Sequence, residues 1–119
     1  MGKTFSKLAN LIAFDYPNNV IYKIVPKDKN MKLCYVGRTT NVERRYSQHN
    51  SGSKHGDKKL YRTIRQYGGM DNFKMEVLEI QDCMNAKEAN QRELFWMKKL
   101  RPNLNTVMMY DGKWHGEYA

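Results

Sequence analysis

Three runs of alternating or β-branched residues predict the strands of a small sheet. Residues 20–25 and 31–36 are rich in β-branched and aromatic side chains, and the charged turn at 26–30 between them predicts an antiparallel hairpin. Gly37 ends the second run. Residues 73–80 alternate between apolar and charged side chains, which predicts a third strand.

Three further segments have helical spacing. Asn41 is a good N-cap for a helix over residues 42–49, a second apolar stripe predicts a helix over 58–67, and Asn85 caps a long helix that ends near residue 100. Residues 50–57 are rich in Ser, Gly and Lys, which predicts a mobile loop between the first two helices. The predicted order is β-β-α-α-β-α, an α/β chain of the α+β type with a small three-stranded antiparallel sheet flanked by helices.

Two tyrosines stand on the paired strands. Alternate side chains of a strand share one face, so Tyr22 and Tyr35 can converge on one patch. Three arginines follow the second tyrosine: Arg38, Arg44 and Arg45. A patch of phenols beside cations suits a phosphate and the water that attacks it. The structural interpretation is that both tyrosines simply pack in the sheet.

Composition narrows the class of protein. With 119 residues, the chain is long enough for one domain with a modest core. It carries 21 lysines and arginines against 12 acids and a formal charge of +9, which favours a polyanionic partner, with nucleic acid first and an anionic membrane second. The alternative is a soluble protein that happens to be basic.

Cysteine count and hydropathy exclude other classes. Cys34 and Cys83 are too few and too far apart for a disulfide framework or a zinc site. No run approaches the roughly 18 consecutive apolar residues of a membrane span, and the N-terminus lacks the apolar stretch of a signal peptide. We therefore expect an intracellular protein that is neither secreted nor embedded in a membrane.

One acidic residue breaks the apolar stripe of the last helix. The stripe includes Ala89 and Met97, and Glu93 falls near its centre. An ionised carboxylate on a core-facing stripe is costly unless it meets a cation or hydrogen-bond donors. The structural interpretation is a salt bridge to a residue such as Arg45, or a side chain that tips out at the stripe edge. The functional interpretation is a ligand for Mg²⁺, which often takes one or two carboxylates and keeps several waters.

Together these residues carry a resemblance to a known family. From residue 20 to about 105 the chain resembles the catalytic domain of the GIY-YIG nuclease superfamily, and most of all its phage and viral homing-type endonucleases. The matching elements are Val20-Ile21-Tyr22, Tyr35-Val36-Gly37, Arg45, His49, Glu93 and Asn105. Val20, where the family has glycine, is the one departure. The resemblance leaves residues 1–19 as an N-terminal arm and 106–119 as a C-terminal tail.

The resemblance implies phosphodiester hydrolysis and a role for each motif residue. Glu93 would hold one Mg²⁺ or Mn²⁺, Arg45 would contact a phosphate oxygen, and Tyr22 and Tyr35 would orient or deprotonate the attacking water. Arg38 would add a second cationic contact, unless it is merely solvated.

The remaining motif residues have less distinct roles. His49 would relay a proton or touch phosphate, with an exposed helix histidine as the alternative. Asn105 would brace the site by hydrogen bonding, with a loop cap as the alternative. His55, in the predicted loop, would match a further active-site histidine of the family. Tyr61 is interpreted as packing.

The function expected is that of a metal-dependent DNA endonuclease that nicks or cleaves duplex DNA, in the cytoplasm or wherever its target DNA resides. A basic surface would bind duplex phosphates with little sequence preference. Its residues are Arg38, Arg44, Lys54, Lys58, Lys59, Arg62 and Arg65. The alternatives are a non-catalytic basic DNA-binding module and a nuclease subunit targeted by a partner protein. The tail is too short for a DNA-recognition domain, so the chain would be an excised catalytic domain, a small enzyme of low specificity, or an enzyme targeted by a separate recognition domain or a partner protein. The apolar tail would pack on the domain or on a second copy, as in a homodimer.

Overall fold

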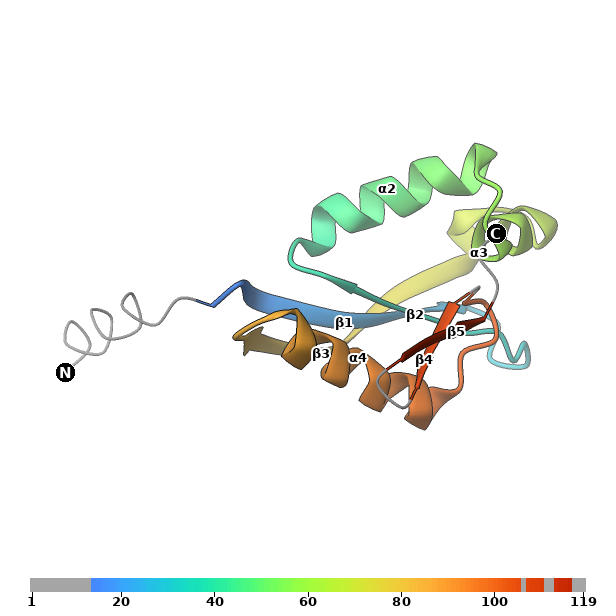
Figure 1. Ribbon diagram of the computed structural model, residues 1–119. Coiled ribbons are helices and arrows are strands. Elements are labelled where there is room, and N and C mark those ends of the chain that lie inside the picture. Colours follow the sequence, from blue (N-terminus) through green and yellow to red (C-terminus); the bar gives the residue numbers. More distant parts are fainter. Residues whose placement is uncertain (1–13, 106, 111–112, 117–119) are drawn as a thin grey trace.

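The computed structural model describes residues 14–105, 107–110 and 113–116 and confirms the α+β order β-β-α-α-β-α (Figure 1). Residues 1–13, most of the predicted arm, lie outside the described residues. The sheet has the order β2-β1-β3, with every pair antiparallel. Its strands are β1 (Tyr16–Pro26), β2 (Tyr35–Thr39) and β3 (Phe73–Cys83).

Helices cover both faces of this sheet. Figure 1 shows α2 and α3 on one side and α4 on the other. The helices are α2 (Val42–His55), α3 (Lys59–Gln66) and α4 (Ala86–Leu100), and a short 3₁₀ turn at Met70–Asn72 leads into β3. A second, two-stranded hairpin of β4 (Val107–Tyr110) and β5 (Lys113–Gly116) follows α4. No helix in the described parts of the chain is long and apolar enough to cross a membrane.

Two predicted boundaries are wrong in ways that affect the site. The second strand begins at Tyr35 rather than at residue 31, so the hairpin connection is longer than predicted. The predicted loop at 50–57 is mostly helix, because α2 continues to His55. Its residues are poor helix formers, but packing against α3 and a hydrogen bond from the Ser53 hydroxyl to the Asn50 carbonyl hold the extra turn.

Side chains of β1 alternate between the two faces, as the twofold period of a strand requires. Tyr22 and Ile24 point to the face of α3 and join the larger core, whereas Ile21 points to the face of α4 and packs with Val36 and Met97. The larger core consists of Tyr22, Ile24, Leu60, Tyr61, Ile64, Met70, Phe73 and Leu104. The predicted helical stripe of α3 is therefore confirmed at Leu60 and Ile64.

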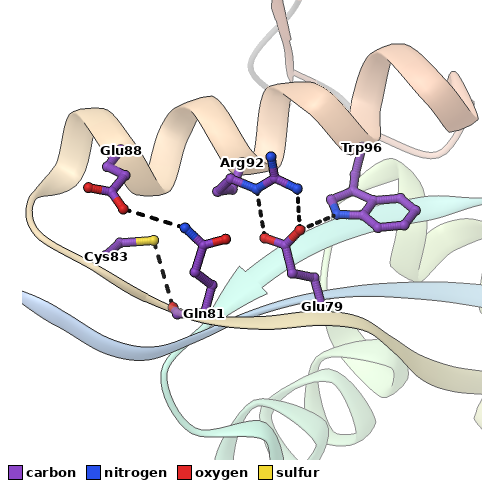
Figure 2. A network of polar contacts seen from close by, with 6 residues as sticks. All are labelled: Glu79, Gln81, Cys83, Glu88, Arg92 and Trp96. Atoms are coloured by element: carbon purple, nitrogen blue, oxygen red, sulfur yellow. Dashed lines mark hydrogen bonds and ion pairs between the residues drawn. The ribbon is translucent and has the colours of Figure 1, made fainter.

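A polar network fixes α4 on the sheet (Figure 2). The Arg92 guanidinium donates from Nε to Oε2 of Glu79 at 2.8 Å and also binds Oε1 through Nη2. The indole N–H of Trp96 donates to the same carboxylate at 3.2 Å. One carboxylate of β3 therefore binds two side chains of α4. Because these bonds restrain the rotation of α4 about its axis, they help to keep Glu93 on the buried side of the helix.

Candidate active site

A histidine and three tyrosines form the centre of the site. The Tyr22 hydroxyl lies 2.6 Å from Nε2 of His49, and the Tyr61 hydroxyl lies 3.0 Å from Nδ1. The rings of Tyr22, Tyr35 and Tyr61 all meet the imidazole edge-on, with centroids 5.6–5.8 Å away. Strands β1 and β2 and helices α2 and α3 each contribute one of these residues.

His49 is fully buried, with 0% of its surface exposed, so the interpretation as an exposed helix histidine is wrong. Burial and the nearby cations Arg45 and Lys58 lower the pKa of His49 to about 4. The imidazole is therefore neutral at pH 7 and carries a single N–H. One of its nitrogens must accept a hydrogen bond from a phenol.

The two motif tyrosines are protonated in the free protein. Burial, the Glu93 carboxylate and Tyr61 raise the pKa of Tyr35 to about 12, although Arg45 and the Tyr22 hydroxyl oppose the shift. The pKa of Tyr22 is raised further, mainly by burial, and again Arg45 opposes the shift. A phenol in this cluster can accept a proton from water only if it transfers its own proton to another group, or if an added positive charge lowers its pKa.

Two arginines face a polar pocket near the N-terminus of α2. Arg38 and Arg45 are half-buried, and each has a buried guanidinium nitrogen (Nη1 and Nε) without a hydrogen-bond partner. Both line a pocket of about 320 Å³ at the start of α2, together with exposed Arg44. Buried donors normally find partners, and phosphate oxygens would supply them here.

Sequence reasoning missed Asn19, which lines the same pocket. The residue is fully buried in β1, and neither its amide oxygen nor its amide nitrogen has a hydrogen-bond partner. A lone asparagine among strand residues gives no signal of this in the sequence, because only the register of β1 turns it inward.

Glu93 is buried on α4, with 6% of its surface exposed, between Ala89 and Met97. Burial raises the pKa of its carboxyl, and only the charge of Arg38 opposes the shift. Within the described residues, no ion pair or hydrogen bond holds this carboxylate, so the structural interpretation as a salt bridge to a residue such as Arg45 is not supported.

The residues present fit a magnesium or manganese ion with one protein carboxylate. A buried, unpaired carboxylate is a hard oxygen ligand in need of a positive partner, and Mg²⁺ commonly takes a single carboxylate and fills its remaining positions with water and phosphate. The described residues contain no group of three or more His, Cys, Asp or Glu side chains that could hold a metal. Glu93 would thus be the ligand, with substrate oxygens and water completing the shell.

Asn105 braces the strand that carries Tyr35. Its side chain accepts a hydrogen bond from the Val36 amide at 3.0 Å and donates one to the Val36 carbonyl at 2.8 Å. Asn103, which sequence reasoning missed, pairs in the same way with the Cys34 amide and the Lys32 carbonyl. The two asparagines extend the sheet beyond β2 with side chains in place of a strand.

The remaining predicted residues lie on the surface. His55 ends α2 and is exposed, outside the tyrosine cluster, as are Arg44, Lys54, Lys59 and Arg62. Lys58 is exposed too, but its ammonium lies 5.6 Å from the ring centroid of Tyr61. Arg65 is exposed as well, and its guanidinium donates to the carbonyls of Ser53 and Gly56 and ties α3 to α2.

Comparison with known proteins agrees with this geometry. A family model described as the GIY-YIG catalytic domain matches residues 18–106. Comparisons with curated proteins and with solved structures found no match. The family match spans both tyrosine strands, the arginine helix, Glu93 and Asn105. The chain therefore belongs to the GIY-YIG catalytic-domain family and is a nuclease that acts on DNA.

Proposed function

We propose that this nuclease is an endonuclease dependent on Mg²⁺ or Mn²⁺, which hydrolyses phosphodiester bonds in duplex DNA. The observation that carries the proposal is Glu93, a buried carboxylate with no cation or hydrogen-bond donor bound to it in the described part of the chain. Folding places it where its charge acts on Arg38 and Tyr35. A metal ion bound there would supply Lewis-acid polarisation of the phosphate and stabilise the leaving 3′ oxygen.

The arginines of the polar pocket would bind the phosphate. The unpartnered nitrogens of Arg38 and Arg45 would donate to its non-bridging oxygens, an arrangement that strengthens as charge develops in the transition state. Arg45 also lies close enough to Tyr22, Tyr35 and His49 for its charge to affect the pKa of each of them. The phosphate would therefore sit beside the phenols that handle the water.

Tyr22 and His49 would together remove the proton of the attacking water. The water proton would pass to the Tyr22 oxygen while the phenolic proton passes to Nε2 of His49, across the 2.6 Å hydrogen bond. The oxygen of the water forms the new bond to phosphorus as the bond to the 3′ oxygen breaks. Phosphate binding would offset the charge of Arg45, which lowers the pKa of His49, and would make the imidazole a better acceptor. Tyr35 would orient the water.

The biological setting is also part of the proposal. A single cluster of this kind in the described residues would cut one strand, so we expect nicking by one copy and double-strand cleavage only if two copies act together. The exposed cations give affinity without base readout. A separate recognition domain or a partner protein would supply a target site, as in the homing-type endonucleases that the sequence resembles.

Incubation of supercoiled plasmid with the purified protein and Mg²⁺ or Mn²⁺ tests this function. We expect relaxation that is lost on chelation of the metal and in Glu93→Ala, but retained in Lys87→Ala, a surface change on the same helix. DNA binding without relaxation in any divalent metal would instead indicate the non-catalytic module or the partner-dependent subunit.

A further inference from the structure

Tyr61 makes a hydrogen bond that packing alone does not require. It lies on α3 with 8% of its surface exposed, and its hydroxyl is 3.0 Å from Nδ1 of His49. The other ring nitrogen of His49 faces Tyr22. The imidazole is thus held between two phenols, of which only Tyr22 belongs to the family's tyrosine pair.

The two distances favour one placement of the imidazole proton. Hydrogen bonds donated by a hydroxyl are shorter than those donated by an N–H, typically by about 0.2 Å. The 2.6 Å contact at Nε2 matches the length expected for an O–H donor, and the 3.0 Å contact at Nδ1 matches that expected for an N–H donor. A neutral imidazole has one N–H, so both distances agree on one tautomer: Nδ1–H donates to Tyr61, and Nε2 accepts from Tyr22.

Gly52 in α2 and Gly56, which caps the C-terminus of that helix, make room for the Tyr61 ring, which independently supports a specific placement of Tyr61. A Cβ at Gly52 would lie 2.6 Å from ring atoms of Tyr61, and one at Gly56 would lie 2.4 Å from the ring. Glycine inside a helix is destabilising by about 1 kcal/mol relative to alanine. Arg65 then ties α3 to the carbonyl of Gly56 at 2.8 Å. Gly52 therefore lowers the stability of α2 at the position where its missing side chain lets Tyr61 approach His49.

We propose that Tyr61 is a positioning residue: its hydroxyl oxygen accepts the Nδ1–H of His49 and so keeps the Nε2 lone pair directed at Tyr22. The arrangement follows the logic of a catalytic triad, in which a third group orients the base that serves the reacting residue. Tyr61 itself would touch neither the phosphate nor the water. The inference rests on the proposed function for its effect on catalysis, but the tautomer it assigns is a property of the free protein.

The test is Tyr61→Phe, which keeps the ring in its slot and removes only the hydroxyl. In metal-free wild type without DNA, ¹⁵N NMR of the His49 imidazole should show the Nδ1–H tautomer, and in the variant the Nε2–H tautomer should become populated. When the DNA concentration is varied, we expect kcat for plasmid nicking to fall by about 10- to 100-fold with KM unchanged. This is the usual scale for loss of an orienting partner. Tyr67→Phe, at the exposed end of the same helix, is the matched control.

Two results would overturn the inference. One is an Nε2–H tautomer in the wild type, and the other is an unchanged Nδ1–H tautomer in Tyr61→Phe, whatever happens to the rate. A wild type that cleaves no DNA would remove the proposed function, but the NMR measurement would still decide the tautomer and the role of Tyr61 in setting it.

Discussion

Gly37 lies directly across from Tyr22 in the β1–β2 pair, and the phenol ring of Tyr22 fills the space that a side chain at Gly37 would occupy. A Cβ there would be 2.4 Å from both Cζ and Oη of the ring. These are the atoms at the end of Tyr22 that binds His49. Tyr22, of the first motif element, thus requires glycine at position 37, in the second motif element. Val20, at the position of the family's first glycine, packs in the interior with 4% exposure and leaves this arrangement intact.

Gly37→Ala should therefore damage both stability and activity. We expect the free energy of unfolding to fall by about 1–3 kcal/mol, as for other overpacked interiors, and nicking to be lost because the Tyr22 hydroxyl must move from Nε2 of His49. Urea unfolding and plasmid nicking measure the two effects. In the double variant with Tyr22→Phe, which removes one of the clashing atoms, the two losses of stability should be less than additive. Strict additivity would show that the two residues do not interact.

Buried His49 should make folding sensitive to acid. The folded protein keeps the imidazole neutral down to about pH 4, whereas the unfolded chain protonates it near pH 6.5. The unfolded state then binds more protons in this window, so stability is lost as the pH falls from about 6.5 to 4, by up to about 3 kcal/mol. Urea unfolding of wild type and His49→Gln across this range isolates the contribution. His55→Gln, which changes an exposed histidine, should keep the wild-type slope, and a wild-type slope in His49→Gln would contradict the account.

The sequence predicted the fold and supplied candidate site residues because periodicity and motif spacing carry local information. The two tyrosines and Glu93 could be placed from the alternation of strands and the stripe of one helix, whereas Arg45 was assigned from the family resemblance. Tyr61 could not be assigned to the site, because its contact with His49 depends on how α3 packs against α2.

Asn19 and Asn103 could not be assigned from the sequence for the same reason. Asn19 is turned inward by the register of β1, and Asn103 binds a strand edge almost seventy residues away in the chain, at Cys34. The continuation of α2 through residues 50–55 could not be predicted from local helix propensity either, because tertiary contacts stabilise it. Such long-range packing leaves no periodic signal in a single sequence.

Asn105 and Asn103 form a matched pair for a test of bracing. Each makes two hydrogen bonds to the backbone at the edge of β2, so alanine at either position should cost about 1–3 kcal/mol of unfolding free energy. Only Asn105→Ala should also reduce nicking, because its partner Val36 lies inside β2, between Tyr35 and Gly37, whereas Cys34 precedes the strand. Equal losses of activity in both variants, after correction for the unfolded fraction, would indicate a general effect on stability.

The Glu79–Arg92 pair should control the position of Glu93 from outside the site (Figure 2). Arg92→Leu leaves the Glu79 carboxylate with only the Trp96 indole, and we expect a loss of about 1–3 kcal/mol together with weaker nicking. A double-mutant cycle with Glu79→Gln measures the coupling. If nicking survived while stability fell, α4 would not need this network to present Glu93.

The most direct test of whether Glu93 holds the catalytic metal is a measurement of Mn²⁺ binding. The binding is monitored by electron paramagnetic resonance in the presence of a short DNA duplex. Wild type should bind Mn²⁺, and Glu93→Gln should lose that binding while remaining at least as stable as wild type, since it removes a buried carboxylate whose pKa is raised by burial. Glu76→Gln, which changes a half-exposed glutamate of β3, should bind as wild type does. Equal Mn²⁺ binding by Glu93→Gln and wild type would contradict the account.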